Sequence, residues 1–176
     1  MTSLGLDISS SCTGVCLMVD DKIETISAIE LGKYKTLWDK ADAVKEYLLG
    51  VQARQSKLDY LSVEEPLLGF QKGMSSATTI TTLMKFNGIV PYISRGIFGI
   101  DPTYISSAHA RKLCGIKMQR TAVAGMSGKE QVFKHMSEND LKDVEWPKKK
   151  NGKEVDWSRD ATDAYVIARA AILMNK

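Results

Sequence analysis

Residues 4 to 14 read Leu-Gly-Leu-Asp-Ile-Ser-Ser-Ser-Cys-Thr-Gly, an apolar segment that contains one carboxylate and ends in small residues. Large apolar residues alternate with Gly5 and Asp7, which predicts a β-strand with a core face and with Asp7 on the other face. The apolar run of residues 15 to 19 predicts the second strand of a hairpin. Because an unpaired buried carboxylate is costly, we expect a cation, a phosphate or a basic side chain near Asp7. An aspartate on a solvent-facing edge strand is the alternative.

The composition suits one ordinary globular domain over residues 1 to 176, because 44% of the residues are hydrophobic. The sequence has no run of about 18 apolar residues and no basic-then-apolar N-terminal pattern, so neither a membrane span nor a signal peptide is expected. A cytoplasmic or nucleoplasmic location is predicted. The spacing of Cys12, Cys16 and Cys114 fits no zinc site, so these residues are expected to be reduced thiols.

The net charge of +3 is unevenly distributed along the chain. Residues 1 to 109 carry 10 Lys and Arg against 12 Asp and Glu, whereas residues 110 to 159 carry 12 against 7. The basic half suggests a polyanionic partner. An ordinary solvated surface remains the alternative on composition alone, because most charge runs are simply solvated.

The first half of the chain predicts strands around one helix. Alternation in residues 23 to 31 predicts a third strand and hence an antiparallel meander. Apolar residues spaced by three and four predict an amphipathic helix over residues 36 to 55. Residues 58 to 64 predict a strand that ends at Glu64-Glu65-Pro66. Adjacent strand residues face opposite sides, and the alternation selects Glu64 to share a face with Asp7.

The middle of the chain predicts a second helix that begins at Ser75 or Ser76 and runs to Asn87, with Gly88 as its end. Its threonine-rich face makes it a candidate dimer or substrate surface. Residues 89 to 93 and 97 to 105 predict strand pieces around two prolines.

The last third predicts further helices. Ser106 and Ser107 are possible caps before a basic segment, and a short helix is expected over residues 129 to 136. A longer helix is expected from Trp157 to Asn175, capped by Ser158. Asp160 and Asp163 lie three residues apart, so both project from the same side of its first turn.

Four acids from three separated segments form the candidate site. Asp160 alone could stabilise a helix dipole. The small side chains that follow Asp163 imply close packing of this helix on a sheet, however, so the pair is expected to face a cleft. Together with Asp7 and Glu64, these residues offer only oxygen ligands, which suit Mg²⁺ or Mn²⁺ rather than zinc. A common use of two such ions is in-line displacement at a phosphodiester.

In this order, the motifs resemble those of the RuvC-type Holliday-junction resolvases of the ribonuclease H-like superfamily, in a phage or viral-like member. The matching motifs are Leu-Gly-Leu-Asp with Thr13-Gly14, Ser-Val-Glu-Glu-Pro, a basic segment, and Asp-Ala-Thr-Asp-Ala near residue 160. The resemblance implies an α/β fold with a mixed five-stranded sheet, a three-stranded antiparallel meander plus parallel strands, and helices on both faces. It also implies a homodimer in the cytoplasm, which is that of a bacterial host if a phage encodes the chain.

The activity that this resemblance implies is resolution of Holliday junctions and other branched DNA by paired nicks that leave 5′-phosphate ends. Two Mg²⁺ ions, which Mn²⁺ could replace, would be held by Asp7, Glu64, Asp160 and Asp163. Lys112 or Lys129 would be the catalytic lysine, and the insertion of residues 116 to 126 leaves this choice open.

Further DNA contacts are expected outside the acids. Arg111 and Lys117, together with Lys112 and Lys129, are expected along the DNA path. In the loop after Pro66, Leu67 and Phe70 are expected to form either a core lid or a wedge for the partner, and Lys72 is expected to contact DNA.

Other functions have to be weighed against this one. An actin-like or sugar-kinase domain also begins with a strand aspartate and a Thr-Gly hairpin, but it needs a second lobe for which 176 residues leave no room. A ribonuclease H-like nuclease acting on RNA–DNA hybrids or replication forks is the main alternative. A non-catalytic branched-DNA-binding module is less favoured, because it should have lost at least one acid.

Overall fold

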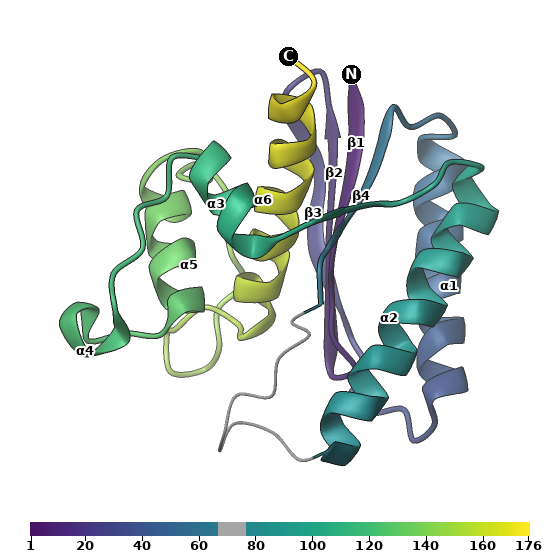
Figure 1. Ribbon diagram of the computed structural model, residues 1–176. Helices are drawn as coiled ribbons and strands as arrows, with labels where there is room; N and C mark the ends of the chain where they lie inside the picture. The colour runs from purple at the N-terminus through teal and green to yellow at the C-terminus, as the bar shows by residue number, and fades with distance from the viewer. Residues whose placement is uncertain (67–76) are drawn as a thin grey trace.

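The computed structural model, which describes residues 1–66 and 77–176, has a central five-stranded sheet with helices on both faces (Figure 1). Its described elements are, in chain order, β1 (Thr2–Ile8), β2 (Cys12–Val19), β3 (Lys22–Glu30), α1 (Leu37–Arg54), β4 (Tyr60–Glu64), α2 (Ala77–Phe98), β5 (Thr103–Ile105), α3 (Ser107–Leu113), α4 (Thr121–Ala124), α5 (Gly128–Glu138) and α6 (Trp157–Met174). No helix in the described part of the chain is long and apolar enough to span a membrane.

The sheet has the predicted mixed topology. Its strand order is β3-β2-β1-β4-β5. Strands β1, β2 and β3 form an antiparallel meander, whereas β4 pairs parallel with β1 and β5 pairs parallel with β4. The fold class expected from the sequence, a meander extended by parallel strands, is therefore confirmed.

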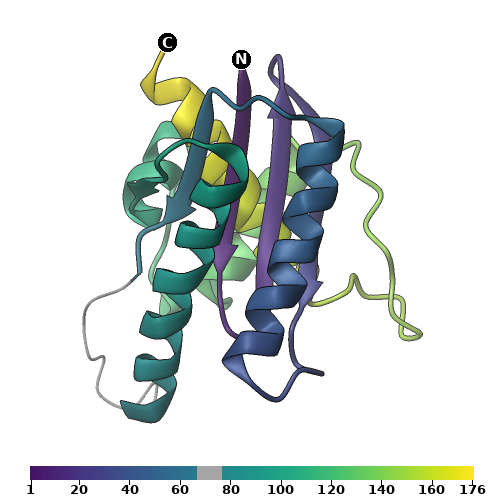
Figure 2. The ribbon, with the colours of Figure 1, turned by 90° about the vertical axis from the view of Figure 1, so that its right-hand side faces the viewer.

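Strand alternation gives the sheet two separate cores. Leu4 and Leu6 of β1 are fully buried against α1 and α2, which cover one face (Figure 2). The intervening Gly5 and Asp7 face α6 on the opposite side, where α3 and α5 pack in turn on α6. The face that carries Asp7 is thus covered by a helix and not by solvent.

Two glycines allow α6 to lie directly on the sheet. A Cβ atom at Gly5 would lie 2.3 Å from the carbonyl oxygen of Ala164, and one at Gly14 would lie 2.0 Å from that of Asp160. Both distances are far below van der Waals contact, so only glycine fits at either position. The close approach fixes the start of α6 against β2 and thereby positions Asp160.

The amphipathic helix predicted over residues 36 to 55 is confirmed as α1. Thr36 is its N-cap residue: the Thr36 side chain accepts a hydrogen bond from the backbone N–H of Asp39 at 3.1 Å, and the Asp39 carboxylate accepts one from the backbone N–H of Thr36 at 3.2 Å. This reciprocal capping box satisfies two donors at the helix start.

The prediction for residues 88 to 98 was wrong, because α2 continues through Gly88 and Pro91 to Phe98. Glycine and proline in a helix interior cost about 1 and 3 kcal/mol relative to alanine. Burial outweighs this cost, since Phe86, Val90 and Phe98 lie on one helical face against the sheet. Of the predicted strand pieces only β5 exists, and the proposed caps Ser75 and Ser76 lie outside the described residues.

The last helix begins at Trp157, as predicted, but a different residue precedes it as the cap. Asp156, and not Ser158, is the N-cap residue of α6, and no side-chain hydrogen bond caps the helix there. Ser158 is instead fully buried, and its hydroxyl donates to the carbonyl oxygen of Val155 at 2.8 Å. Upstream, Ser106 caps α3 as expected, accepting from the backbone N–H of His109.

Candidate active site

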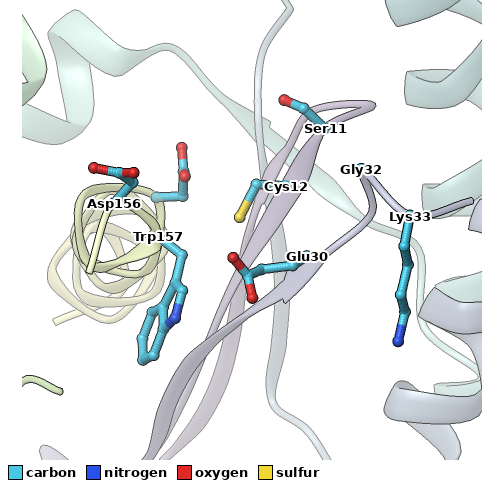
Figure 3. A pocket seen from close by; sticks show the side chains of 8 residues that line it. Ser11, Cys12, Glu30, Gly32, Lys33, Asp156 and Trp157 are labelled. Atoms are coloured by element: carbon cyan, nitrogen blue, oxygen red, sulfur yellow. The ribbon is translucent and has the colours of Figure 1, made fainter. Parts of the chain in front are cut away.

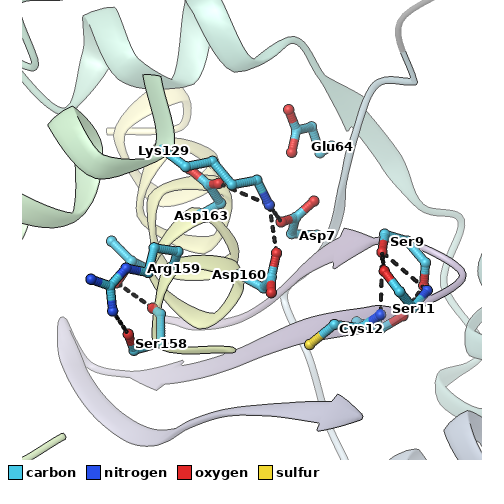
Figure 4. Close-up of polar contacts among 12 residues, drawn as sticks. Asp7, Ser9, Ser11, Cys12, Glu64, Lys129, Ser158, Arg159, Asp160 and Asp163 are labelled. Carbon is cyan, nitrogen blue, oxygen red and sulfur yellow. Dashed lines mark hydrogen bonds and ion pairs between the residues drawn. The ribbon is translucent and has the colours of Figure 1, made fainter. Parts of the chain in front are cut away.

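The two strand acids lie side by side at one end of the sheet. Asp7 is near the end of β1, and Glu64 is the last residue of β4, its parallel neighbour. Pairing of Gly5 with Ser62 and of Leu6 with Val63 places Glu64 next to Asp7 on the α6 face. Figure 4 shows both carboxylates on the same side of the sheet.

Lys129 lies at the centre of the remaining acids. Its ammonium nitrogen is 3.0 Å from Oδ2 of Asp7, 2.5 Å from Oδ1 of Asp160 and 3.5 Å from Oδ2 of Asp163 (Figure 4). Lys129 comes from the first turn of α5, so three elements contribute to this cluster. The structure therefore brings Lys129, and not Lys112, into contact with the acids.

Glu64 is held by a different partner. Its Oε1 atom accepts a hydrogen bond from the hydroxyl of Ser107, in the first turn of α3. The sequence indicated Ser107 only as a possible helix cap, and no pattern in the sequence links it to Glu64. This contact orients the fourth carboxylate toward the cluster.

Burial sets the protonation of the cluster. Asp7 and Asp163 are 6% and 5% exposed. Desolvation raises the pKa of Asp7 to about 7, against the opposing charge of Lys129 and with help from Glu64. Desolvation and the charge of Asp7 likewise raise the pKa of Asp163 to about 7. Partial burial alone would lower the pKa of Lys129, but the three aspartates outweigh it and raise that pKa.

The other predicted basic residues differ in their relation to the acids. Arg111 forms an ion pair with one of them, with its Nη2 atom 3.9 Å from Oδ1 of Asp163. Lys112 is exposed and lines, with Lys117, a separate cavity of about 600 Å³ beside α3. The predicted DNA contacts Leu67, Phe70 and Lys72 lie outside the described residues.

Two cavities flank the acids. One, of about 550 Å³, is bounded by Glu64, Ser107, Arg111 and Lys129. The other, of about 530 Å³, lies against Asp160, between the start of β2 and the end of β3 on one side and the start of α6 on the other (Figure 3). It is lined by Ser11, Cys12, Glu30, Gly32, Lys33, Asp156, Trp157 and Asp160.

The site fits a hard divalent cation by its donors. Among the described residues, no three Asp, Glu, His or Cys side chains already stand as a ligand set. Three carboxylates nevertheless converge on one positive group, the ammonium of Lys129, which occupies a cation position. Carboxylate oxygens without nitrogen or sulfur ligands favour Mg²⁺ or Mn²⁺.

Comparison of the sequence with protein-family models found no match, and comparison with curated proteins found none either. Solved structures do match. RuvC of Thermus thermophilus in complex with a Holliday junction substrate superposes with a TM-score of 0.68 at 14% identity, covering 99% of this chain and 94% of that one.

Two further structures agree. A second structure of Thermus thermophilus RuvC gives a TM-score of 0.62 at 16% identity, with 99% and 95% of the two chains covered. The yeast mitochondrial Holliday junction resolvase Ydc2 gives 0.54 at 15% identity, with 98% and 80% covered. The chain therefore has the ribonuclease H-like fold of the RuvC-type resolvases.

Proposed function

We propose that this protein is a metal-dependent endonuclease that resolves Holliday junctions and other branched DNA by paired nicks. The observation that carries the proposal is the convergence of Asp7, Asp160 and Asp163 on one cation position. Glu64 stands on the neighbouring strand, and basic side chains of α3 and α5 adjoin the acids. A negatively charged site beside positive groups suits a reaction at a phosphate.

Each residue has a role in this proposal. Asp7, Glu64, Asp160 and Asp163 would hold two Mg²⁺ ions, which Mn²⁺ could replace. When bound, such ions activate a water molecule and stabilise the charge on the leaving 3′ oxygen, which gives 5′-phosphate ends. Ser107 orients the carboxylate of Glu64.

Basic side chains have separate tasks. Lys129 neutralises the acids in the absence of an ion, and because its side chain is half exposed, its ammonium can pair with the substrate phosphate. Arg111 lies close enough to Asp163 to contribute to the same phosphate site. Lys112 and Lys117, farther out on and after α3, are assigned to the DNA backbone.

The assembly follows from the reaction. Resolving a four-way junction takes two symmetric cuts, and one chain carries one set of four acids. A C₂ dimer supplies the second set through a contact that uses the same patch twice. Helix α2 is the candidate contact, because Thr78, Thr81, Met84 and Tyr92 are exposed along it.

A substrate panel tests the proposal. Labelled four-way junctions, replication forks, RNA–DNA hybrids and linear duplexes are incubated with the protein and Mg²⁺, and the ends of the products are mapped. We expect paired symmetric cuts in the junction and little cutting of the linear duplex. Preferred cutting of the hybrid would favour a nuclease of another specificity, and tight binding without cutting in any metal would favour a binding module.

A further inference from the structure

Residues 147 to 155 form a β-hairpin directly before α6. The backbone N–H of Val155 donates to the carbonyl oxygen of Pro147 at 3.0 Å. The backbone N–H of Lys149 donates to the carbonyl oxygen of Lys153 at 2.7 Å. Gly152, with φ of +80°, occupies the turn, and its N–H donates to the carbonyl oxygen of Lys149 at 2.9 Å. These bonds define one backbone conformation for the segment, which projects from the body of the molecule in Figure 2.

Aromatic packing anchors the first arm of this hairpin. Trp146, the residue before it, packs against Phe133 of α5 with ring centroids 5.7 Å apart. It also packs edge-on against Trp157 of α6 with centroids 6.2 Å apart. Such pairs each contribute about 0.5–1.5 kcal/mol beyond the burial of their area.

Polar contacts anchor the second arm. Arg159 of α6 donates through Nη1 to the carbonyl oxygen of Val155 at 3.3 Å. The same guanidinium donates through Nε to Glu130 of α5 at 2.9 Å and lies 4.0 Å from Glu154 of the hairpin. Both arms are thus fixed to the two helices that carry Lys129, Asp160 and Asp163.

The tip of the hairpin concentrates positive charge. Lys148, Lys149, Lys150 and Lys153 are all exposed, and no acidic residue lies between them. Lys149 pairs with Asp156 at 2.5 Å. No ion pair joins the other three lysines to any residue in the described parts of the chain. A cluster of exposed positive charges on a fixed element attracts a polyanion such as a DNA backbone.

The hairpin also lies beside the catalytic acids. Asp156 and Trp157, at its base, line the cavity of about 530 Å³ that ends at Asp160. Lys33 stands on the opposite wall of this cavity (Figure 3). The basic residues of α3 line other cavities, so the hairpin lies on a different side of the acids from Arg111.

We propose that the lysine hairpin of residues 147 to 155 is a second DNA-backbone contact, which holds a duplex arm on the side of Asp160 away from α3. This inference rests on the proposed function. It assigns binding, and no catalytic role, to Lys148 and Lys150, two exposed lysines of the first arm and turn. Lys148 pairs across the hairpin with Glu154, but neither lysine forms an ion pair with a described residue.

The test compares two double variants with equal loss of charge. Lys148→Gln with Lys150→Gln neutralises the hairpin. Lys22→Gln with Lys57→Gln neutralises two exposed lysines, one at the start of β3 and one shortly before β4, at the opposite end of the sheet from the acids. Binding of a labelled four-way junction is measured in EDTA over a range of salt concentrations, and thermal unfolding verifies that each variant is folded.

The hairpin variant should bind roughly tenfold more weakly, with a salt slope smaller by about two units, because each lost phosphate contact removes about 0.9 from that slope. The control variant should match the wild type, and Lys148→Arg with Lys150→Arg should keep full affinity.

Three results would overturn the inference. They are an unchanged slope in the hairpin variant, an equal loss in the control variant, or weak binding by the arginine variant while it remains folded. None of these three results would contradict the proposed function, as long as the wild type binds and cuts junctions. Failure of the wild type to bind or cut any branched DNA would instead refute the proposed function.

Discussion

Lys129 and a divalent cation would compete for the same carboxylates. The ammonium lies within 3.5 Å of oxygen atoms of Asp7, Asp160 and Asp163. Two like-charged groups cannot share this space without strong repulsion. In the proposed function, metal loading would therefore require Lys129 to leave the centre of the cluster, which would free its ammonium for the substrate.

Lys129→Met should affect the metal-free and metal-bound protein in opposite directions. Without metal, we expect a loss of about 2 kcal/mol in the free energy of unfolding, below the usual cost of breaking a buried pair because Lys129 is half exposed. Mn²⁺ affinity should rise, because no ammonium has to be displaced. Chemical denaturation and calorimetric titration measure the two quantities. Lys112→Met, which removes an exposed lysine, should change neither, and weaker Mn²⁺ binding by Lys129→Met would contradict this account.

The buried aspartates predict how stability depends on pH. The pKa values of Asp7 and Asp163 rise from 3.8 to about 7 on folding, so the folded state binds more protons between these limits. Stability of the metal-free protein should therefore fall as the pH rises from about 4 to about 7. Mg²⁺ should reduce this loss, because it stabilises the ionised carboxylates. Melting temperatures across this window measure the effect, and metal-free stability that rises with pH would exclude it.

At the scale of elements, Gly14 determines where α6 begins to pack. Gly14→Ala should cost about 2–3 kcal/mol of stability, because the added methyl group overpacks the contact with the backbone of Asp160. The shift of α6 should also weaken Mn²⁺ binding. Gly50→Ala is the control, since no atom lies within 4 Å of a Cβ atom there. In the helix α1 it should stabilise the protein by about 0.5–1 kcal/mol. Normal Mn²⁺ affinity in a folded Gly14→Ala protein would separate α6 packing from the metal site.

Elements were predictable from the sequence where local pattern and burial agree. The meander, α1 and the strand that ends at Glu64 follow from alternation and from helical spacing. Helix α2 was predicted too short, because local signals at Gly88 and Pro91 oppose a helix that only tertiary burial of Phe98 and its neighbours maintains.

The site was predictable only in part for a related reason. Asp7, Glu64, Asp160 and Asp163 stand out because acids are unexpected in apolar strands and on a closely packed helix. The contacts of Lys129 and Ser107 with the acids depend on how α5 and α3 dock, because they join residues 122 and 43 positions apart in the chain. Nothing in the local sequence distinguishes Lys129 from Lys112.

For the whole molecule, the proposed dimer predicts the effect of one surface change. Tyr92 of α2 is 75% exposed and adjoins Trp38 of α1, which is 70% exposed, in a shared apolar groove. Tyr92→Glu should give a folded monomer that nicks junctions but does not make paired cuts. Sedimentation and product mapping test both parts. Val123→Glu, at a 73% exposed position of α4, should remain dimeric. Paired incision by a Tyr92→Glu monomer would show that the dimer is unnecessary.

The most direct test of the central claim is cleavage and binding of a four-way junction by the wild type and by Asp7→Asn. With Mg²⁺, the wild type should cut the junction and EDTA should abolish cutting. Asp7→Asn should lower the cleavage rate by at least about a hundredfold, the upper end of what even outer-shell changes cost a metal site. Its junction affinity should be unchanged or higher, because the substitution removes repulsion between a carboxylate and phosphate. Full cleavage by Asp7→Asn, or by the wild type in EDTA, would contradict a metal-dependent site at these acids.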